Sequence, residues 1–228
     1  IVASAAARGT AFVAFDAHRA GDFAPHLGRT TDFGKTWKLV TDGLPCDAPV
    51  RSIYEYPGKA SVVFAGTERH LFVSNDSGAH WTQLSANLPT TRYDDILVHP
   101  RTKDLVLGTH GRSIWILDDA SPIAEWSSGI SAKSAYLFQP ARATLMLYWE
   151  DVSNMAQGLF MAENPADGAV FTYWLAKPAQ KVKLTIRGTN GKIIREFDGP
   201  NKPGVVQRAV WDLRHVPPPA SAGAGNFG

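Results

Sequence analysis

The chain has 228 residues, of which 44% are hydrophobic and 19% are charged, and its formal net charge is +2 at pH 7. This composition predicts a globular protein with room for one large or two modest domains, and it excludes a disordered chain. The small, scattered charge excludes binding driven by a basic or acidic surface, as to nucleic acid or an anionic membrane.

The chain begins with a non-methionine residue and has no long apolar run, so we expect no signal peptide or transmembrane helix, and we expect an internal segment of a longer protein. Cys46 is the only cysteine, which excludes an intrachain disulfide and a cysteine-based metal site. We expect its thiol to have a structural role in a loop.

Short alternating or apolar runs, separated by turn residues, predict strands through the first half of the chain. They fall into three groups, which the sequence places at 1–4, 11–15 and 37–40, then 50–54, 62–67, 71–74 and 81–84, then 95–100, 105–109 and 113–118.

An internal repeat organises these groups. The octet at 30–37 (TTDFGKTW) recurs at 74–81 (SNDSGAHW), and Leu44-Pro45 recurs as Leu88-Pro89 at the same offset of 44. A third copy follows at an offset of 42, where Gly66 corresponds to Gly108 and Asp76 to Asp118, and its last part diverges. A period of about 40–45 residues is that of a four-stranded propeller blade.

The octet pattern Ser/Thr-x-Asp-x-Gly-x-Thr-Trp resembles the Asp-box (BNR) β-propellers, which include sialidases, xyloglucanase-like glycosidases and sortilin-type receptors. The resemblance implies an all-β fold with a partial propeller at 1–122 and four-stranded blades at about 1–45, 46–90 and 91–122. It also places the boxes on the outer rim, remote from a central site.

The box residues are expected to be structural. Asp32 and Asp76 would accept hydrogen bonds in a hairpin, Gly34 and Gly78 would adopt a positive φ, and Trp37 and Trp81 would bury apolar area there. His80 replaces the usual threonine, so we expect one hydroxyl hydrogen bond fewer in the second box.

Three blades do not close a ring, because propellers need about four or more. We therefore expect missing propeller blades upstream of Ile1, or another protein chain, to cover the first blade.

A connecting segment at 123–164 is expected to contain one short helix before an extended run at 135–138. Strand patterns at 169–175, 182–186, 193–197 and 205–213, with an Asn190-Gly191 hairpin turn, predict a β-sandwich at 165–219. This part is similar to the small immunoglobulin-like domain, of the flagellar-hook-capping type, that follows bacterial Asp-box propellers. Residues 220–228 are predicted to be a flexible tail.

No catalytic or metal-binding constellation stands out. The adjacent pairs Asp94-Asp95 and Asp118-Asp119 would point to opposite faces of a strand, so neither converges as a glycosidase pair. The histidines lack metal-ligand spacing, and the Phe/Tyr-Arg-Ile-Pro element of sialidases is absent. We predict no catalytic residue, no metal and no cofactor.

Two equivalent loops carry the candidate ligand face, Glu68 and Arg69 in one and His110 and Arg112 in the next. The same residues could instead brace neighbouring blades through hydrogen bonds, and this second interpretation is favoured.

These patterns favour a non-catalytic module, periplasmic, secreted or at the cell surface, that binds protein or glycan through propeller loops. One alternative is part of a glycoside hydrolase whose catalytic residues lie mostly outside this segment. The other is a structural subunit that docks through its open blade. The sequence motif Asn75-Asp76-Ser77 matches a glycosylation acceptor within the box, a match that arises often by chance.

Overall fold

The computed structural model describes residues 1–145 and 162–215. The fold is all-β, a partial propeller followed by a β-sandwich, as the sequence predicts. The chain divides into two compact units, Ile1–Ser127 and Ser128–Gly228, here called the propeller unit and the sandwich unit. The expectations for part of the connecting segment (146–161) and for the tail (220–228) concern residues outside the described part.

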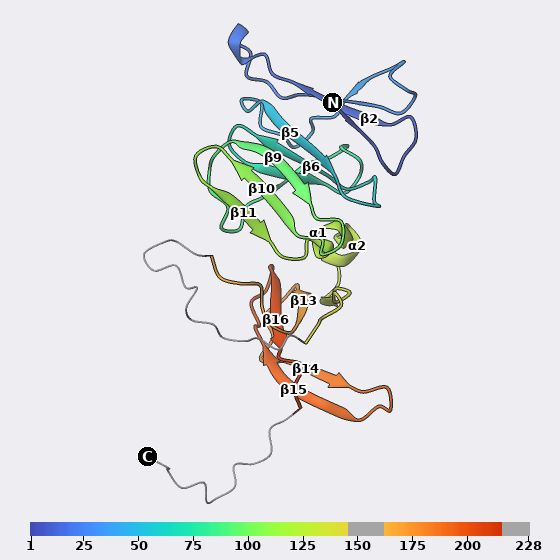
Figure 1. Ribbon diagram of the computed structural model, residues 1–228, viewed down its shortest axis with the longest axis vertical. Helices are drawn as coiled ribbons and strands as arrows, with labels where there is room; N and C mark the ends of the chain where they lie inside the picture. Colours follow the sequence, from blue (N-terminus) through green and yellow to red (C-terminus); the bar gives the residue numbers. More distant parts are fainter. Residues whose placement is uncertain (146–161, 216–228) are drawn as a thin grey trace, which may run out of the picture. The chain divides into compact units, whose positions relative to one another are not determined.

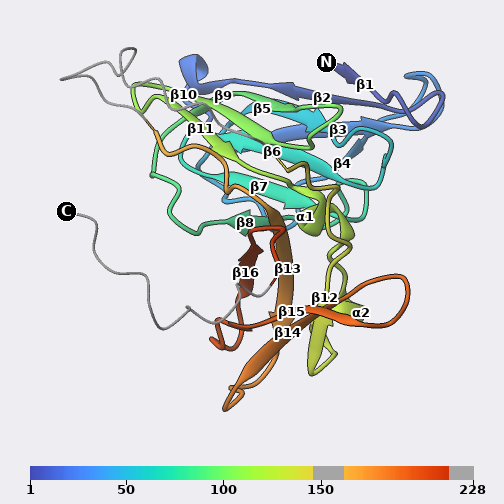
Figure 2. The same ribbon diagram turned by 60° about the horizontal axis from the view of Figure 1, so that its bottom comes forward.

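The propeller unit consists of three antiparallel sheets that follow one another in chain order (Figures 1 and 2). Within each sheet, consecutive strands are hydrogen-bonded neighbours, the up-and-down order of a propeller blade. The strands are β1 (Val2–Ala3), β2 (Ala11–Phe15), β3 (His26–Thr30) and β4 (Lys38–Leu39) in blade 1; β5 (Val50–Glu55), β6 (Val63–Thr67), β7 (Leu71–Ser74) and β8 (Thr82–Leu84) in blade 2; β9 (Tyr93–Val98), β10 (Leu105–Thr109) and β11 (Ile114–Leu117) in blade 3.

Apolar side chains fill the space between consecutive blades. Phe12 and Leu27 of blade 1 pack against Val63, Phe72 and Trp81 of blade 2, all of them buried. A second cluster joins the other face of blade 2 to blade 3, and its fully buried members include Phe64, Leu71, Tyr93, Val98, Leu105 and Leu107. Because successive side chains of a strand point to opposite faces, the middle blade is covered on both sides and all of β6 is buried.

Blade 3 ends differently from blades 1 and 2. After β11 the chain forms the short helices α1 (Ser121–Glu125) and α2 (Ser128–Ser131), whereas the sequence predicted a single short helix. Pro122 occupies the first turn of α1, where its missing N–H costs nothing, and Ala124 is buried in the cluster between blades 2 and 3. No fourth strand of this sheet lies within the described residues.

The sandwich unit has a three-stranded and a two-stranded sheet. The first has the order β12 (Ala135–Leu137), β13 (Ala169–Leu175) and β16 (Val206–Trp211), and the second pairs β14 (Val182–Arg187) with β15 (Ile193–Gly199). Strand β12 therefore comes from the segment that was expected only to connect the two domains. Buried Tyr173 and Leu175 of the first sheet pack with Val182, Leu184 and Phe197 of the second.

The turn between β14 and β15 follows the sequence prediction. Gly191 has a φ of 76°, and the amide nitrogen of Lys192 lies 3.0 Å from the side-chain oxygen of Asn190. Glycine suits this position because it tolerates the left-handed backbone, and asparagine suits the preceding one because its side chain accepts a hydrogen bond from the chain two residues on.

Candidate functional site

The first Asp-box is a closed hydrogen-bonded hairpin between β3 and β4. Asp32 accepts a bond from the Thr36 amide at 2.9 Å and from the Thr36 hydroxyl at 2.6 Å, and the Thr30 hydroxyl donates to it at 2.8 Å. These donors, with the Thr36 hydroxyl contributing most, lower the pKa of Asp32 to about 2. The carboxylate is thus fixed in its ionised form by local backbone and hydroxyl groups.

The second box repeats this geometry with a histidine as donor. The His80 amide lies 2.9 Å from Asp76 Oδ1, and His80 Nδ1 lies 2.6 Å from Asp76 Oδ2. The ring nitrogen thereby takes the place of the threonine hydroxyl, so the expected loss of one hydrogen bond does not occur. The bond to Asp76 raises the pKa of His80. Burial acts to raise the pKa of Asp76, but the bonds from His80 and Ser74 outweigh it and lower that pKa.

The two box tryptophans differ in their surroundings. Trp81 is 5% exposed, and its indole N–H donates at 2.8 Å to the carbonyl of Val40, which belongs to the preceding blade. Trp37 is 46% exposed and donates at 3.2 Å to Gly34 within its own hairpin. The second box therefore also ties blade 2 to blade 1.

In the third copy, the strand register places Asp119, rather than Asp118, at the position of Asp76. Val73 lies opposite Phe64 and Ile116 opposite Val106, so residues after the β10–β11 loop correspond at an offset of 43. The extra residue lies in that loop, which runs from Thr109 to Ser113 where blade 2 needs only Thr67 to His70. The amide of Asp119 donates a hydrogen bond to the carboxylate of Asp104 at 3.1 Å. The carboxylate of Asp119 accepts a hydrogen bond from the amide of Ser121, at the start of α1.

At the opposite end of the strands from the boxes, charged side chains join blade 1 to blade 2. Arg51 at the start of β5 forms ion pairs with Asp16, at the end of β2, and with Glu68, whose Oε2 lies 2.6 Å from Arg51 Nε. Asp16 also pairs with His18, and the His18 amide contributes most to a lowered pKa of Asp16. Arg69 extends the set through a 2.9 Å ion pair with Asp47.

A second group of charges lies on blade 3, around Arg92. Its Nε lies 2.6 Å from Asp94, and its Nη2 lies 2.8 Å from His110 Nδ1. The hydrogen bond that Arg92 donates to Asp94 is the main cause of a raised pKa of Arg92, and the charge of Glu68 adds to it. Two groups of paired charges, here together called the loop-face network, thus lie on the three blades: Asp16, Arg51 and Glu68 in one, and Arg92, Asp94 and His110 in the other.

The structure places the four predicted ligand-face residues unequally. Glu68 and His110 belong to the loop-face network, and Arg69 lies beside it, paired with Asp47. Arg112 is exposed, and among the described residues no acceptor pairs with its guanidinium. Sequence reasoning missed Asp16, Arg51 and Arg92 as members; their places at the ends of β2, β5 and β9 were the available signal.

The arrangement pairs each carboxylate of the network with an arginine: Asp16 and Glu68 with Arg51, and Asp94 with Arg92. No group of three or more histidine, cysteine, aspartate or glutamate side chains suited to a metal ion occurs in residues 1–145 and 162–215. None of the helices in this part is long and apolar enough to span a membrane.

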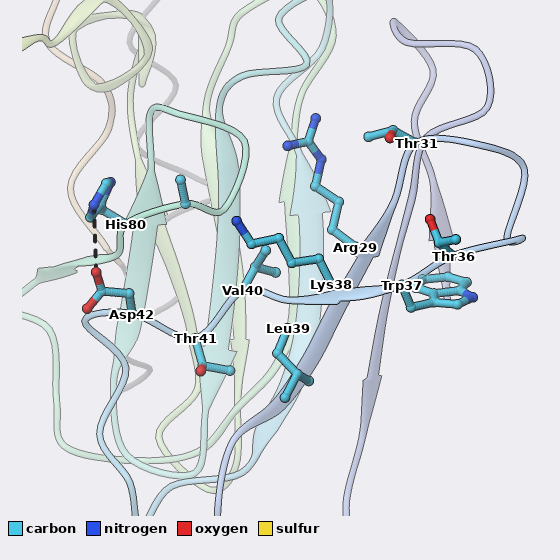
Figure 3. A pocket seen from close by; sticks show the side chains of 11 residues that line it. Arg29, Thr31, Thr36, Trp37, Lys38, Leu39, Val40, Thr41, Asp42 and His80 are labelled. Atoms are coloured by element: carbon cyan, nitrogen blue, oxygen red, sulfur yellow. Dashed lines mark ion pairs between the residues drawn. The ribbon is translucent and has the colours of Figure 1, made fainter.

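Two cavities lie away from the loop-face network. One, of about 700 Å³, lies at the box end between blades 1 and 2, and Figure 3 shows its lining side chains. The other, of about 320 Å³, lies between the two sheets of the sandwich unit and is lined mainly by apolar side chains. Neither cavity brings two carboxylates together, as hydrolysis of a glycoside requires.

The family-model match agrees with the resemblance seen in the repeat. Residues 26–129 match the Sortilin-Vps10 family model, described as "Sortilin, neurotensin receptor 3". A crystal structure of an ancestral GH74 enzyme is similar at 16% identity and a TM-score of 0.41, over 49% of this chain and 13% of that enzyme. The chain thus spans a small part of that enzyme's length. No curated protein matched the chain. The family-model match supports a propeller-type module.

Proposed function

We propose that this chain is a non-catalytic interaction module that acts outside the cytoplasm and binds a protein or glycan through the loop face of its propeller unit. The observation that carries the proposal is the loop-face network, in which arginines hold the carboxylates in ion pairs across three blades. These ion pairs hold the side chains of the loops in place. The receptor named in the matched family description is consistent with a binding role.

Arg112 is the contact residue that this proposal singles out. It projects from the β10–β11 loop, is exposed, and lacks a carboxylate partner among the described residues, so a ligand does not have to break an existing ion pair to reach it. Guanidinium groups bind carboxylate and phosphate groups in a bidentate fashion, which suits acidic glycans and acidic peptides alike.

The test is a binding screen of the whole chain against a glycan array and a displayed peptide library, followed by an assay for hydrolysis of any glycan found. We expect binding without hydrolysis, and we expect Arg112→Gln to weaken it by about tenfold, the usual value of one charge-assisted contact. Arg101→Gln is the matched control, because Arg101 is also an exposed arginine and lies in the β9–β10 loop, at the other end of blade 3.

Two results would contradict the proposal. Turnover of a glycan that is lost in Glu68→Gln or Asp94→Asn would identify a hydrolase. The absence of any ligand for the loop face in both screens would favour the structural-subunit alternative.

We further propose that another propeller blade covers blade 1 in the working protein. Trp37 and Leu39 are 46% and 67% exposed on its outer face. The outer face of blade 3 has the same character, since Ile114 and Ile116 (69% and 63% exposed) occupy the positions of Leu71 and Val73, which are buried against the next blade. Exposed apolar positions that correspond to positions buried between blades elsewhere in the repeat are expected to pack against another blade of the same kind.

A further inference from the structure

A row of three side chains on the inner face of blade 1 breaks the pattern of the repeat. Phe12 lies opposite Arg29, and Arg29 lies opposite Lys38, across β2, β3 and β4. The corresponding row of blade 2 is Phe64, Val73 and Thr82. Blade 1 therefore carries two cations where blade 2 carries a buried valine and a threonine.

These two cations lack compensating charges. Like charges directly opposite on neighbouring strands destabilise a sheet. Among the described residues, no carboxylate forms an ion pair with Arg29 or Lys38. The Nε of Arg29 is also buried without a hydrogen-bond partner, although its guanidinium lies 6.0 Å from the ring centroid of Phe12. A buried donor without an acceptor destabilises the folded state.

Both cations line the box-end cavity of about 700 Å³ between blades 1 and 2. Figure 3 shows Arg29 and Lys38 side by side, with Thr31 beyond them and His80 of the second box on the far side. The one carboxylate in the lining belongs to Asp42, and it lies 3.6 Å from His80 Nε2. Donors and positive charge thus surround a space that is open to solvent.

We propose that this cavity binds a tetrahedral oxyanion, a sulfate or phosphate group, between the guanidinium of Arg29 and the ammonium of Lys38. The anion accepts hydrogen bonds from the guanidinium of Arg29 and the ammonium of Lys38 and neutralises the two opposed cations. A free ion and the ester of a sugar present the same group to the site. This site lies at the opposite end of the strands from the loop face and does not depend on the function proposed for that face.

The experiment measures anion binding to the whole chain by calorimetry at pH 7 and low ionic strength. Sodium sulfate, sodium phosphate and N-acetylglucosamine 6-sulfate are the probes, and sodium chloride at equal ionic strength is the reference. We expect wild-type protein to bind at least one oxyanion, and a stronger response to the sugar ester than to free sulfate would identify an ester as the source.

The variants take their residues from blade 2. Arg29→Val introduces the residue found at the corresponding position of blade 2, Val73, and Lys38→Thr introduces the residue corresponding to Thr82. Both variants are therefore expected to fold. We expect Arg29→Val to weaken binding by about tenfold or more and Lys38→Thr by a smaller factor, because the guanidinium supplies two donors and the ammonium one. Arg101→Gln, in the β9–β10 loop of blade 3, is expected to bind as wild type, because Arg101 takes no part in either proposed site.

Circular dichroism establishes that each variant is folded, and Arg29→Gln serves in place of Arg29→Val if the valine variant does not fold. Unchanged sulfate and phosphate affinity in the Arg29 variant, or responses no larger than those to chloride, would overturn the proposal. Failure of the loop-face screens would leave this result unaffected, since Arg29 and Lys38 take no part in that face.

Discussion

The unequal environments of the two box tryptophans lead to a quantitative prediction. Trp81→Phe and Trp37→Phe remove the same indole N–H from equivalent positions of the repeat. In blade 2 the lost partner is the carbonyl of Val40, a residue that is 6% exposed, and in blade 1 it is the carbonyl of the exposed Gly34. The same chemical change therefore has different consequences for the free energy of unfolding.

The magnitude follows from what replaces each hydrogen bond. A buried carbonyl left without a donor costs about 1–3 kcal/mol, and the smaller ring leaves unfilled space beside Phe72 and Val63 that costs about 1 kcal/mol more. Water replaces the lost donor at Gly34, so Trp37→Phe is expected to change stability by about 0.5 kcal/mol or less. We expect Trp81→Phe to be the more destabilising by about 2 kcal/mol.

Urea denaturation of the whole chain, followed by far-ultraviolet circular dichroism, measures this difference, because the substitutions alter tryptophan fluorescence itself. A difference of this size should appear as a lower midpoint for Trp81→Phe with an unchanged slope. Equal losses in both variants would refute the reasoning, since they would mean that the Val40 contact does not stabilise the interface between blades 1 and 2.

Three further predictions concern the boxes. Because its folded pKa is about 2, Asp32 contributes stability that is present above pH 3.8 and is lost as the pH falls towards 2, so acid titration of Asp32→Asn should show a flatter profile there. Asp76 raises the pKa of His80 above 6.5, so the stability that this pair contributes is fully present below pH 6.5 and is lost as the pH rises through the pKa of His80 in the folded protein. The thermal unfolding temperature of His80→Thr should therefore lack this pH dependence between pH 6 and 8. Gly34 and Gly78 both have a positive φ, so replacing either with alanine strains the backbone, and we expect Gly34→Ala to lower the free energy of unfolding by about 1 kcal/mol. The Cβ added by Gly78→Ala would also lie 3.3 Å from the Phe12 ring, so denaturation should show a loss larger by about 1–3 kcal/mol for this variant.

The strands of the propeller unit were largely predictable, because alternation and turn residues are local signals. One strand was missed, β3 (His26–Thr30), although the repeat itself pointed to it. Thr30 corresponds to Ser74, the last residue of β7, so the offset of 44 places a strand directly before the first box. The histidine and glycine in β3 weaken its local pattern, and only the comparison between copies reveals it.

The candidate site was less predictable, because its contacts depend on how blades pack. The ion pairs of Arg51 with Asp16 and Glu68 join residues 35 and 17 positions apart, and no local pattern indicates either pair. The role of the four predicted ligand-face residues stays a prediction, as does the immunoglobulin-like character of the sandwich unit. The offset of 42 was wrong for Asp118. It was set by matching Gly66 to Gly108, which both precede the loop, so it does not account for the one additional residue in the β10–β11 loop.

A repeat protein separates two kinds of requirement within one sequence. Positions where the copies agree in chemistry, as for Phe12 and Phe64 or Leu27 and Leu71, meet the need of each blade to bury one face on the next. Arg29 stands where Val73 and Ile116 stand in the other copies, so packing between blades does not require it. Since two cations opposite each other without carboxylate partners are unfavourable, their presence there needs another cause, and the proposed binding of an anion supplies one.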